Sequence, residues 1–308
     1  MPLCNQRFAR NDQIYTDGGA DIVRAGSGFD FVWLAAGLPG EISDLDGGAD
    51  SDTLNLSGIS AGVLVSDSSG AGSDIIITSA VTGLQIGVAR GFEEIDGTSS
   101  ADTIDLSHQI INFRVVGDGG GDTITGGSGD DDLSGGAGND SITGGGGNDQ
   151  MSGGDGDDIL VAGPDNGKTT EFNQYQDRLD GGAGNDRLVA GYNTVLTGGT
   201  GADTFVFLTD PGDFTFVAQF DKGADKIDLT GFDANANVAG QQHFVWANGS
   251  NNGQIGVLNY AQVGFGSIGG QTLADYQVTA DTDGDGVVDF SFYVRYVGAT
   301  MSQSDFFI

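Results

Sequence analysis

The sequence predicts an all-β fold: a parallel β-roll with 18 residues per coil, flanked by a β-rich N-terminal segment and followed by a β-rich C-terminal cap. The first observation is a block of nine residues that repeats without a gap from residue 117 to residue 161. The first six positions of each block are rich in glycine, which turns sharply and adopts positive φ without strain. The last three resemble a short strand with one inward-pointing apolar residue, so two blocks make one coil with two strands.

The second observation is that two positions of the block keep their residue type. Position six is aspartate in all five blocks: Asp122, Asp131, Asp140, Asp149 and Asp158. Position eight is apolar in all five: Ile124, Leu133, Ile142, Met151 and Leu160. Further copies have their position-six aspartate at Asp177, Asp186 and Asp203, eroded copies at Asp12, Asp21 and Asp30, and single weak copies at Asp52 and Asp102. A flexible glycine-aspartate linker would not keep both positions in phase, so a stacked structure is favoured.

Composition divides the chain into four segments. Residues 1–40 hold the eroded repeats, and residues 41–112 form a β-rich intermediate segment, as strands of the same solenoid or as an inserted sandwich-like layer. Residues 113–206 are the roll, interrupted by an insertion at 162–175 that is either a surface bulge or a binding loop. Residues 207–308 are richer in aromatic residues, as a capping domain with its own core requires.

The charge balance limits the partners. The chain has 11 Lys and Arg against 44 Asp and Glu, which gives a net charge of −33. Nucleic acid and anionic membrane surfaces are disfavoured, because both are bound through basic patches. No apolar run reaches the roughly 18 residues of a membrane helix, and the N-terminus lacks the apolar stretch of a cleaved signal peptide. Cys4 is the single cysteine, so disulfides within the chain and cysteine-based metal sites are excluded.

The roll needs a cation to be stable. One apolar residue in nine contributes about 1.5–3 kcal/mol on burial, whereas ordering the backbone of nine residues costs on the order of 9–18 kcal/mol. Stacking also places aspartate beside aspartate along each edge, which is repulsive unless a cation lies between them. Calcium suits this arrangement because it takes about 6–8 oxygen ligands in variable geometry, whereas magnesium demands a tight octahedron.

The nonapeptide resembles the G-G-x-G-x-D-x-U-x repeat of RTX (repeats-in-toxin, hemolysin-type) calcium-binding proteins. The resemblance implies several Ca2+ ions, held by position-six carboxylates and by backbone carbonyls of the turns. One edge would hold Asp122, Asp140 and Asp158, and the other Asp131 and Asp149. The implied ligands also include Asp177, Asp186 and Asp203, the carbonyls of Gly127, Gly129, Gly136, Gly138, Gly145, Gly147, Gly154 and Gly156, and Asp12, Asp21 and Asp30. For these last three, a metal-free solenoid is the alternative.

The C-terminal region adds three signals. Residues 204–229 resemble the cap that follows RTX arrays in serralysin-type proteases and in alginate epimerase R modules. Asp281, Asp283 and Asp285 match the start of an EF-hand loop, but the final glutamate is replaced by phenylalanine and both flanks resemble strands. We therefore expect a hairpin turn there, with or without an additional calcium ion. Residues 304–308 resemble the uncleaved C-terminal signal of type I secretion substrates.

No catalytic constellation is recognised, so we expect a protein that is not an enzyme. Residues 58–62 match the G-x-S-x-G nucleophile elbow, but no helical pattern follows them. H-E-x-x-H is absent, and His108 and His243 are expected to be structural or surface residues. The favoured function is a secreted protein that folds on binding extracellular calcium, as a matrix, surface-layer, filament or adhesion component, with self-assembly or a cell-surface glycan as its interaction. The alternatives are a polysaccharide-active or lipolytic enzyme and a glycan-binding or membrane-perturbing effector.

Overall fold

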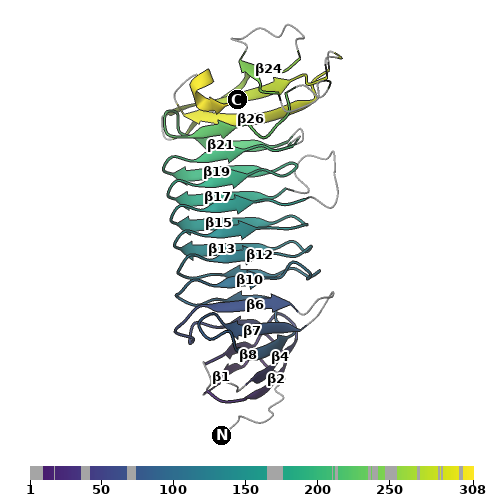
Figure 1. Cartoon of the computed structure of the whole chain (residues 1–308), viewed down its shortest axis with the longest axis vertical. Coiled ribbons are helices and arrows are strands. Elements are labelled where there is room, and N and C mark those ends of the chain that lie inside the picture. Colours follow the sequence, from purple (N-terminus) through teal and green to yellow (C-terminus); the bar gives the residue numbers. More distant parts are fainter. Residues whose placement is uncertain are drawn as a thin grey trace. The chain divides into compact units, whose positions relative to one another are not determined.

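The computed structural model describes residues 10–308, except for residues 17, 36–41, 68–73, 165–175, 210, 212–213, 235–236, 238–241, 247–254, 269–270, 284, 286 and 298–300. The described residues form strands and turns, which confirms the all-β prediction (Figure 1). The chain divides into two compact units, Met1–Asp155 and Gly156–Ile308. The one helix among the described residues is a 3₁₀ turn at Gln303–Asp305, so none found there could span a membrane.

In the first unit, one sheet contains strands that all pair in parallel. In spatial order they are β1 (Gln13–Tyr15), β3 (Phe31–Trp33), β5 (Thr53–Asn55), β9 (Glu94–Asp96), β11 (Arg114–Val116), β13 (Asp132–Ala137) and β15 (Gln150–Asp155). Val115 pairs with Leu133, and Leu133 pairs with Met151. Partners in these coils are therefore 18 residues apart, as two nonapeptides per coil predict.

The second sheet of this unit contains a short antiparallel meander. In spatial order its strands are β2 (Ile22–Ser27), β4 (Ser43–Ala49), β8 (Gln85–Arg90), β7 (Ile75–Ser79), β6 (Val63–Asp67), β10 (Thr103–Asp105), β12 (Thr123–Thr125) and β14 (Ser141–Thr143). Strands β6, β7 and β8 pair antiparallel, and the other neighbours pair in parallel. Residues 41–112 thus add strands to both sheets of the solenoid, which was the first of the two alternatives.

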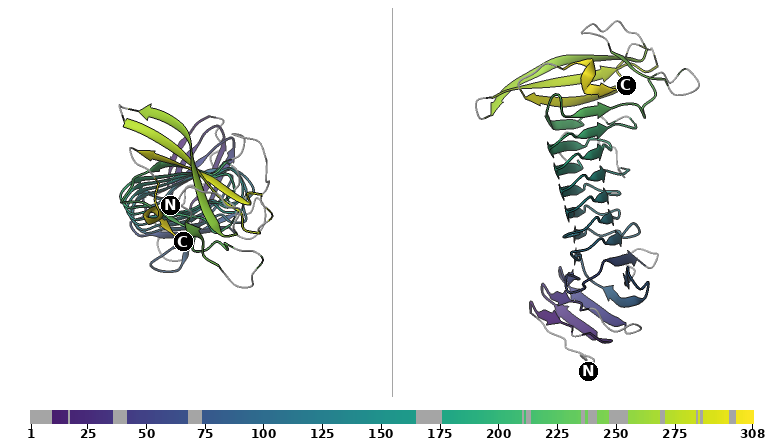
Figure 2. Two further views of the ribbon diagram at one scale, coloured as in Figure 1. Left: turned by 90° about the horizontal axis from the view of Figure 1, so that it is seen from above. Right: turned by 60° about the vertical axis from the view of Figure 1, so that its left-hand side comes forward.

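In the second unit, the first sheet combines short parallel strands with longer antiparallel ones. Its strands are β17 (Arg178–Ala183), β19 (Val195–Thr200), β21 (Phe216–Phe220), β26 (Phe290–Val297), β25 (Gln271–Ala280), β24 (Val257–Ile268) and β23 (Val245–Trp246). Strands β24, β25 and β26 pair antiparallel; Figure 2 shows these longer strands at the C-terminal end of the unit. The other sheet is parallel and consists of β16 (Ile159–Val161), β18 (Arg187–Val189), β20 (Thr204–Val206), β22 (Lys226–Asp228) and β27 (Phe306–Phe307).

The core is a narrow column of position-eight side chains. Ile124, Leu133 and Ile142 are fully buried in the first unit, as are Leu188 and Phe205 in the second. Their neighbours along each strand point outward and are mostly half-buried or exposed. The C-terminal strands add a true aromatic core, in which the closest ring pairs are Phe207–Phe292, Phe220–Tyr296 and Phe232–Phe290. Burial of one side chain per nonapeptide leaves the fold dependent on interactions in the turns.

Candidate metal centre

The position-six aspartates lie above one another along the turns. Each stands immediately before a strand, and within a stack the peptide N–H of one aspartate donates to Oδ1 of the aspartate in the next coil. These stacks, which we call the aspartate rows, are Asp12–Asp30–Asp52, Asp102–Asp122–Asp140 and Asp131–Asp149 in the first unit, and Asp158–Asp186–Asp203–Asp225 in the second. The N···O distances lie between 2.7 Å, as for Asp122 to Asp140, and 3.0 Å, as for Asp186 to Asp203. Apart from Asp12, these carboxylates are buried.

The two oxygens of these carboxylates differ in their surroundings. Oδ1 accepts the peptide N–H of the neighbouring coil, as described above. Oδ2 of several row aspartates is buried and accepts no hydrogen bond among the described residues, as in Asp30, Asp52, Asp122, Asp186 and Asp203. A buried anionic oxygen without a partner is costly, because it has lost its water without compensation. These atoms are therefore oriented and available for a cation.

A glycine at position one makes room for each carboxylate. A Cβ built on Gly181 would overlap Oδ2 of Asp186, and one on Gly198 would overlap Oδ2 of Asp203. Gly117 has the same relation to Asp122. The carboxylate thus lies over the Cα atom of the position-one glycine in its own block, in space that the side chain of any other residue would occupy.

The glycine carbonyls named from the sequence lie in columns beside the rows. The carbonyl oxygen of Gly127 faces the Cα atom of Gly145 in the next coil and accepts the N–H of Gly146 at 2.9 Å. Gly129 faces Gly147, and Gly136 faces Gly154, in the same way. Gly138 and Gly156 complete the predicted set and lie in turns that follow β13 and β15. The donor set along each turn is therefore composed of carboxylate and carbonyl oxygens, which are the ligands of a hard cation such as calcium.

Burial changes the acidity of the rows. Desolvation, assisted by the neighbouring carboxylates, raises the pKa of Asp122 and of Asp186 to about 6. The same causes raise the pKa of Asp52 to about 7 and that of Asp225 to about 6. The backbone N–H bonds oppose this effect without cancelling it. At neutral pH Asp122, Asp186 and Asp225 are therefore mostly ionised in an environment that disfavours their charge, whereas Asp52 is about half protonated.

Not every edge of the roll carries an uninterrupted row. Asp21 is buried, but the residue above it in the next coil is Ser43, whose Oγ accepts the Asp21 N–H at 3.3 Å. Asp177 precedes β17, whereas the neighbouring strands β19 and β21 are preceded by Thr194 and Thr215. The negative charge along this edge of the second unit therefore ends with Asp177.

Three members of the rows are absent from the ligand set predicted from the sequence: Asp52, Asp102 and Asp225. Each of their blocks has lost at least one of the glycines at positions one, two and four, so only part of the nonapeptide pattern remains. The surviving signal is an apolar residue two positions after the aspartate, and each of these residues (Leu54, Ile104 and Ile227) is fully buried.

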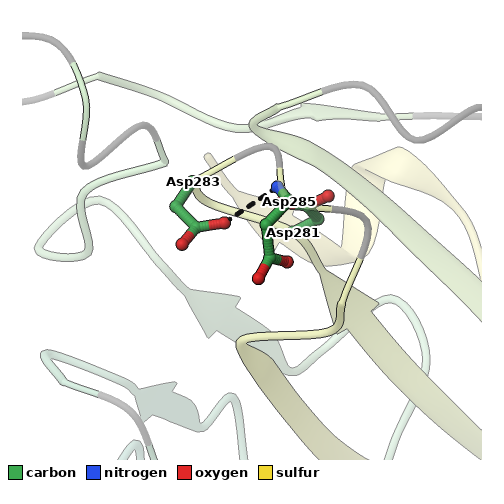
Figure 3. A group of neighbouring side chains, drawn as sticks. All are labelled: Asp281, Asp283 and Asp285. Atoms are coloured by element: carbon green, nitrogen blue, oxygen red, sulfur yellow. Dashed lines mark hydrogen bonds between the residues drawn. The ribbon is translucent and has the colours of Figure 1, made fainter.

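The acidic motif near the C-terminus lies in a hairpin turn. Asp281, Asp283 and Asp285 connect β25 to β26, and one carboxylate oxygen of each lies within 4.8 Å of the others (Figure 3). Oδ1 of Asp283 accepts the N–H of Asp285 at 3.0 Å, and Asp289 accepts the N–H of Thr282 at 2.7 Å. The predicted hairpin is confirmed, and the three carboxylates are brought together at its turn.

The other motifs lie away from the aspartate rows. The G-x-S-x-G sequence at 58–62 connects β5 to β6, so the strand is followed by another strand rather than by the helix that a nucleophile elbow requires. His108 and His243 are exposed. The described part of the insertion is limited to residues 162–164, because residues 165–175 lie outside the described residues.

Comparison with protein families supports the assignment made from the rows. The RTX calcium-binding nonapeptide repeat matches in four copies, at residues 9–32, 114–142, 134–167 and 173–191. The chain contains RTX repeats. They form a parallel β-roll and bind Ca2+ at several sites, and proteins with RTX repeats are typically secreted. No curated protein matches the chain.

Proposed function

We propose that this protein is a secreted, non-enzymatic scaffold whose RTX roll folds when it binds calcium outside the cell. The observation that carries the proposal is the set of buried Oδ2 atoms in the aspartate rows that accept no hydrogen bond among the described residues. A calcium ion placed beside them compensates their charge and attracts the turn carbonyls of the adjacent coil. The binding free energy then becomes folding free energy, because the site does not exist in the unfolded chain.

The same chemistry couples folding to export. Where calcium is scarce, repulsion among carboxylates and the thin core keep the chain unfolded, which suits passage through a type I secretion channel. Outside the cell, calcium at the roughly 10⁻⁴–10⁻³ M typical of extracellular sites fills the rows and folds the roll. Residues 207–308, whose start resembles the cap of serralysin-type proteases and alginate epimerases, close the end of the solenoid. The hairpin carboxylates of Asp281, Asp283 and Asp285 are proposed as an additional calcium site.

A structural role is favoured over an enzymatic one. The G-x-S-x-G sequence stands between two strands, and the buried ionisable groups of the rows are accounted for by calcium binding. Such a roll would act as a matrix, surface-layer, filament or adhesion component, through self-assembly or contact with a cell-surface glycan. Ordered polymers that form on addition of calcium would support this role, whereas hydrolysis of a polysaccharide or lipid would favour an enzyme.

Circular dichroism tests the calcium dependence directly. At neutral pH the strand signal should be weak with excess chelator and should rise cooperatively as calcium is added. Magnesium at the same concentration should restore little of the signal, because it keeps its waters and demands octahedral geometry. A strand signal that excess chelator leaves unchanged would contradict the proposal.

A further inference from the structure

Two groups of aspartates in the rows differ in what Oδ2 contacts. In Asp102, Asp131 and Asp225, Oδ2 accepts the peptide N–H of the residue at position two of the same block. The donors are Thr98 at 2.6 Å, Gly127 at 2.8 Å and Asp221 at 2.7 Å. We call these closed aspartates. In the open aspartates, namely Asp30, Asp52, Asp122, Asp186 and Asp203, Oδ2 accepts no hydrogen bond among the described residues, and each side chain is almost fully buried.

The difference follows the backbone conformation at position two. In the blocks of the open aspartates this residue has positive φ: +117° in Gly26, +112° in Gly48, +76° in Asp118, +102° in Gly182 and +101° in Gly199. In the blocks of the closed aspartates, Thr98, Gly127 and Asp221 do not have positive φ. With positive φ, the position-two N–H does not reach the carboxylate, and Oδ2 is left without a donor. Where φ at position two is not positive, the N–H of that residue lies beside Oδ2 and donates a hydrogen bond to it.

Residue type explains part of this pattern. Thr98 is β-branched, and positive φ is strongly unfavourable for such a residue. Gly127 could adopt positive φ, but its turn stacks on residues 109–112, which are not a nonapeptide turn. The N–H of Ser128 donates to the carbonyl of Gln109 there at 2.9 Å. The conformation of Gly127 is therefore imposed by the neighbouring coil.

The closed aspartates also lie at the ends of their rows. Oδ1 of Asp102 accepts the N–H of Val63, and Oδ1 of Asp131 accepts the N–H of Phe113, so no carboxylate faces them on that side. In the second unit, the aspartate preceding the strand next to β22 is Asp305, whose Oδ2 lies 3.9 Å from Nζ of Lys222. At these ends the protein's own N–H groups and a lysine provide the compensation that a cation would supply.

We infer that the conformation of position two decides which aspartates bind calcium: the open aspartates are ligands, and Asp102, Asp131 and Asp225 remain metal-free ends of the rows. This inference rests on the proposed calcium binding and specifies which aspartates act as its ligands. A calcium ion at a closed aspartate would compete with a buried or partly buried hydrogen bond to Oδ2, and loss of that bond would leave the peptide N–H without a partner. Asp131 is the decisive case, because it belongs to a complete nonapeptide and the repeat pattern alone makes it a ligand.

Two matched pairs of variants test the inference. Asp122→Asn and Asp131→Asn change the same charge in adjacent blocks, one at an open and one at a closed aspartate. Asp186→Asn and Asp225→Asn form the equivalent pair in the second unit, which keeps the test decisive where Asp131→Asn fails to fold. Bound calcium per chain is counted by equilibrium dialysis and atomic emission at saturating calcium, with circular dichroism to verify folding.

We expect Asp122→Asn and Asp186→Asn to bind at least one ion fewer per chain than the unmodified protein. Asp131→Asn and Asp225→Asn should bind as many ions as the unmodified protein. Equal losses from both members of a pair would overturn the inference and leave the calcium-dependent folding intact. An unmodified protein that folds without binding any calcium would contradict the proposed function itself.

Discussion

In calcium-free buffer, lowering the pH from about 8 to about 5 should shift the protein from the unfolded toward the folded state. The pKa of Asp122, Asp186 and Asp225 is raised to about 6, and that of Asp52 to about 7, chiefly by burial. An aspartate in the unfolded chain titrates near 3.9. Between these values the folded state binds more protons than the unfolded state, so stability falls as the pH rises through the folded-state pKa.

The opposite trend is expected when calcium is saturating. Calcium binds only the deprotonated carboxylate, so protons compete with it and the bound state gains stability as the pH rises. Asp44 does not disturb the comparison: its hydrogen bond from Arg24 lowers its pKa, so it titrates below this pH range. The strand signal in circular dichroism at both pH values tests the calcium-free trend, and urea midpoints at both pH values test the trend at saturating calcium. A calcium-free protein that is more stable at the higher pH would contradict the account of the rows.

Phe205→Ala should be among the most destabilising single substitutions in the roll. Phe205 is fully buried in β20, between Leu188 and Ile227 of the adjacent strands, and its ring centroid lies 6.1 Å from that of Phe220. Truncation of a buried phenylalanine costs about 3–5 kcal/mol. Because each coil buries so few apolar side chains, the neighbouring coils cannot fill the cavity.

The matched control is Ile159→Ala in the same sheet. Ile159 points outward from β16 and is 44% exposed, so its truncation should change the free energy of unfolding by no more than about 0.5 kcal/mol. Both variants are unfolded with urea at one fixed calcium concentration, since bound calcium itself adds to the measured stability. Similar losses from the two variants would indicate that the column of position-eight side chains is not the core.

The roll could be predicted from the sequence because its period is local. Nine residues per strand fix the 18-residue register between Ile124 and Ile142 independently of distant contacts. The antiparallel meander of β6, β7 and β8 has no such period. Its order in the sheet depends on β8 reaching back to pair with β4, a contact across some forty residues that no local pattern specifies.

The candidate site likewise combines features that the sequence period predicts with features that it does not. The regular spacing of aspartate and apolar residues is enough to place Asp122 and Asp140 in one row, because they stand 18 residues apart in the repeat. The sequence does not distinguish Asp122 from Asp131, because both occupy position six of consecutive blocks. They differ in the φ angle of the residue at position two, which is positive in Asp118 but not in Gly127. Tertiary packing against residues 109–112 of the neighbouring coil sets the angle of Gly127.

The most direct measurement is a crystal structure from calcium-containing solution, with anomalous diffraction recorded at a wavelength where calcium scatters strongly. We expect anomalous peaks along the aspartate rows, beside the Oδ2 atoms of Asp122, Asp186 and Asp203 and in contact with glycine carbonyls of the adjacent turns. A well-ordered roll without anomalous peaks along these rows would contradict it.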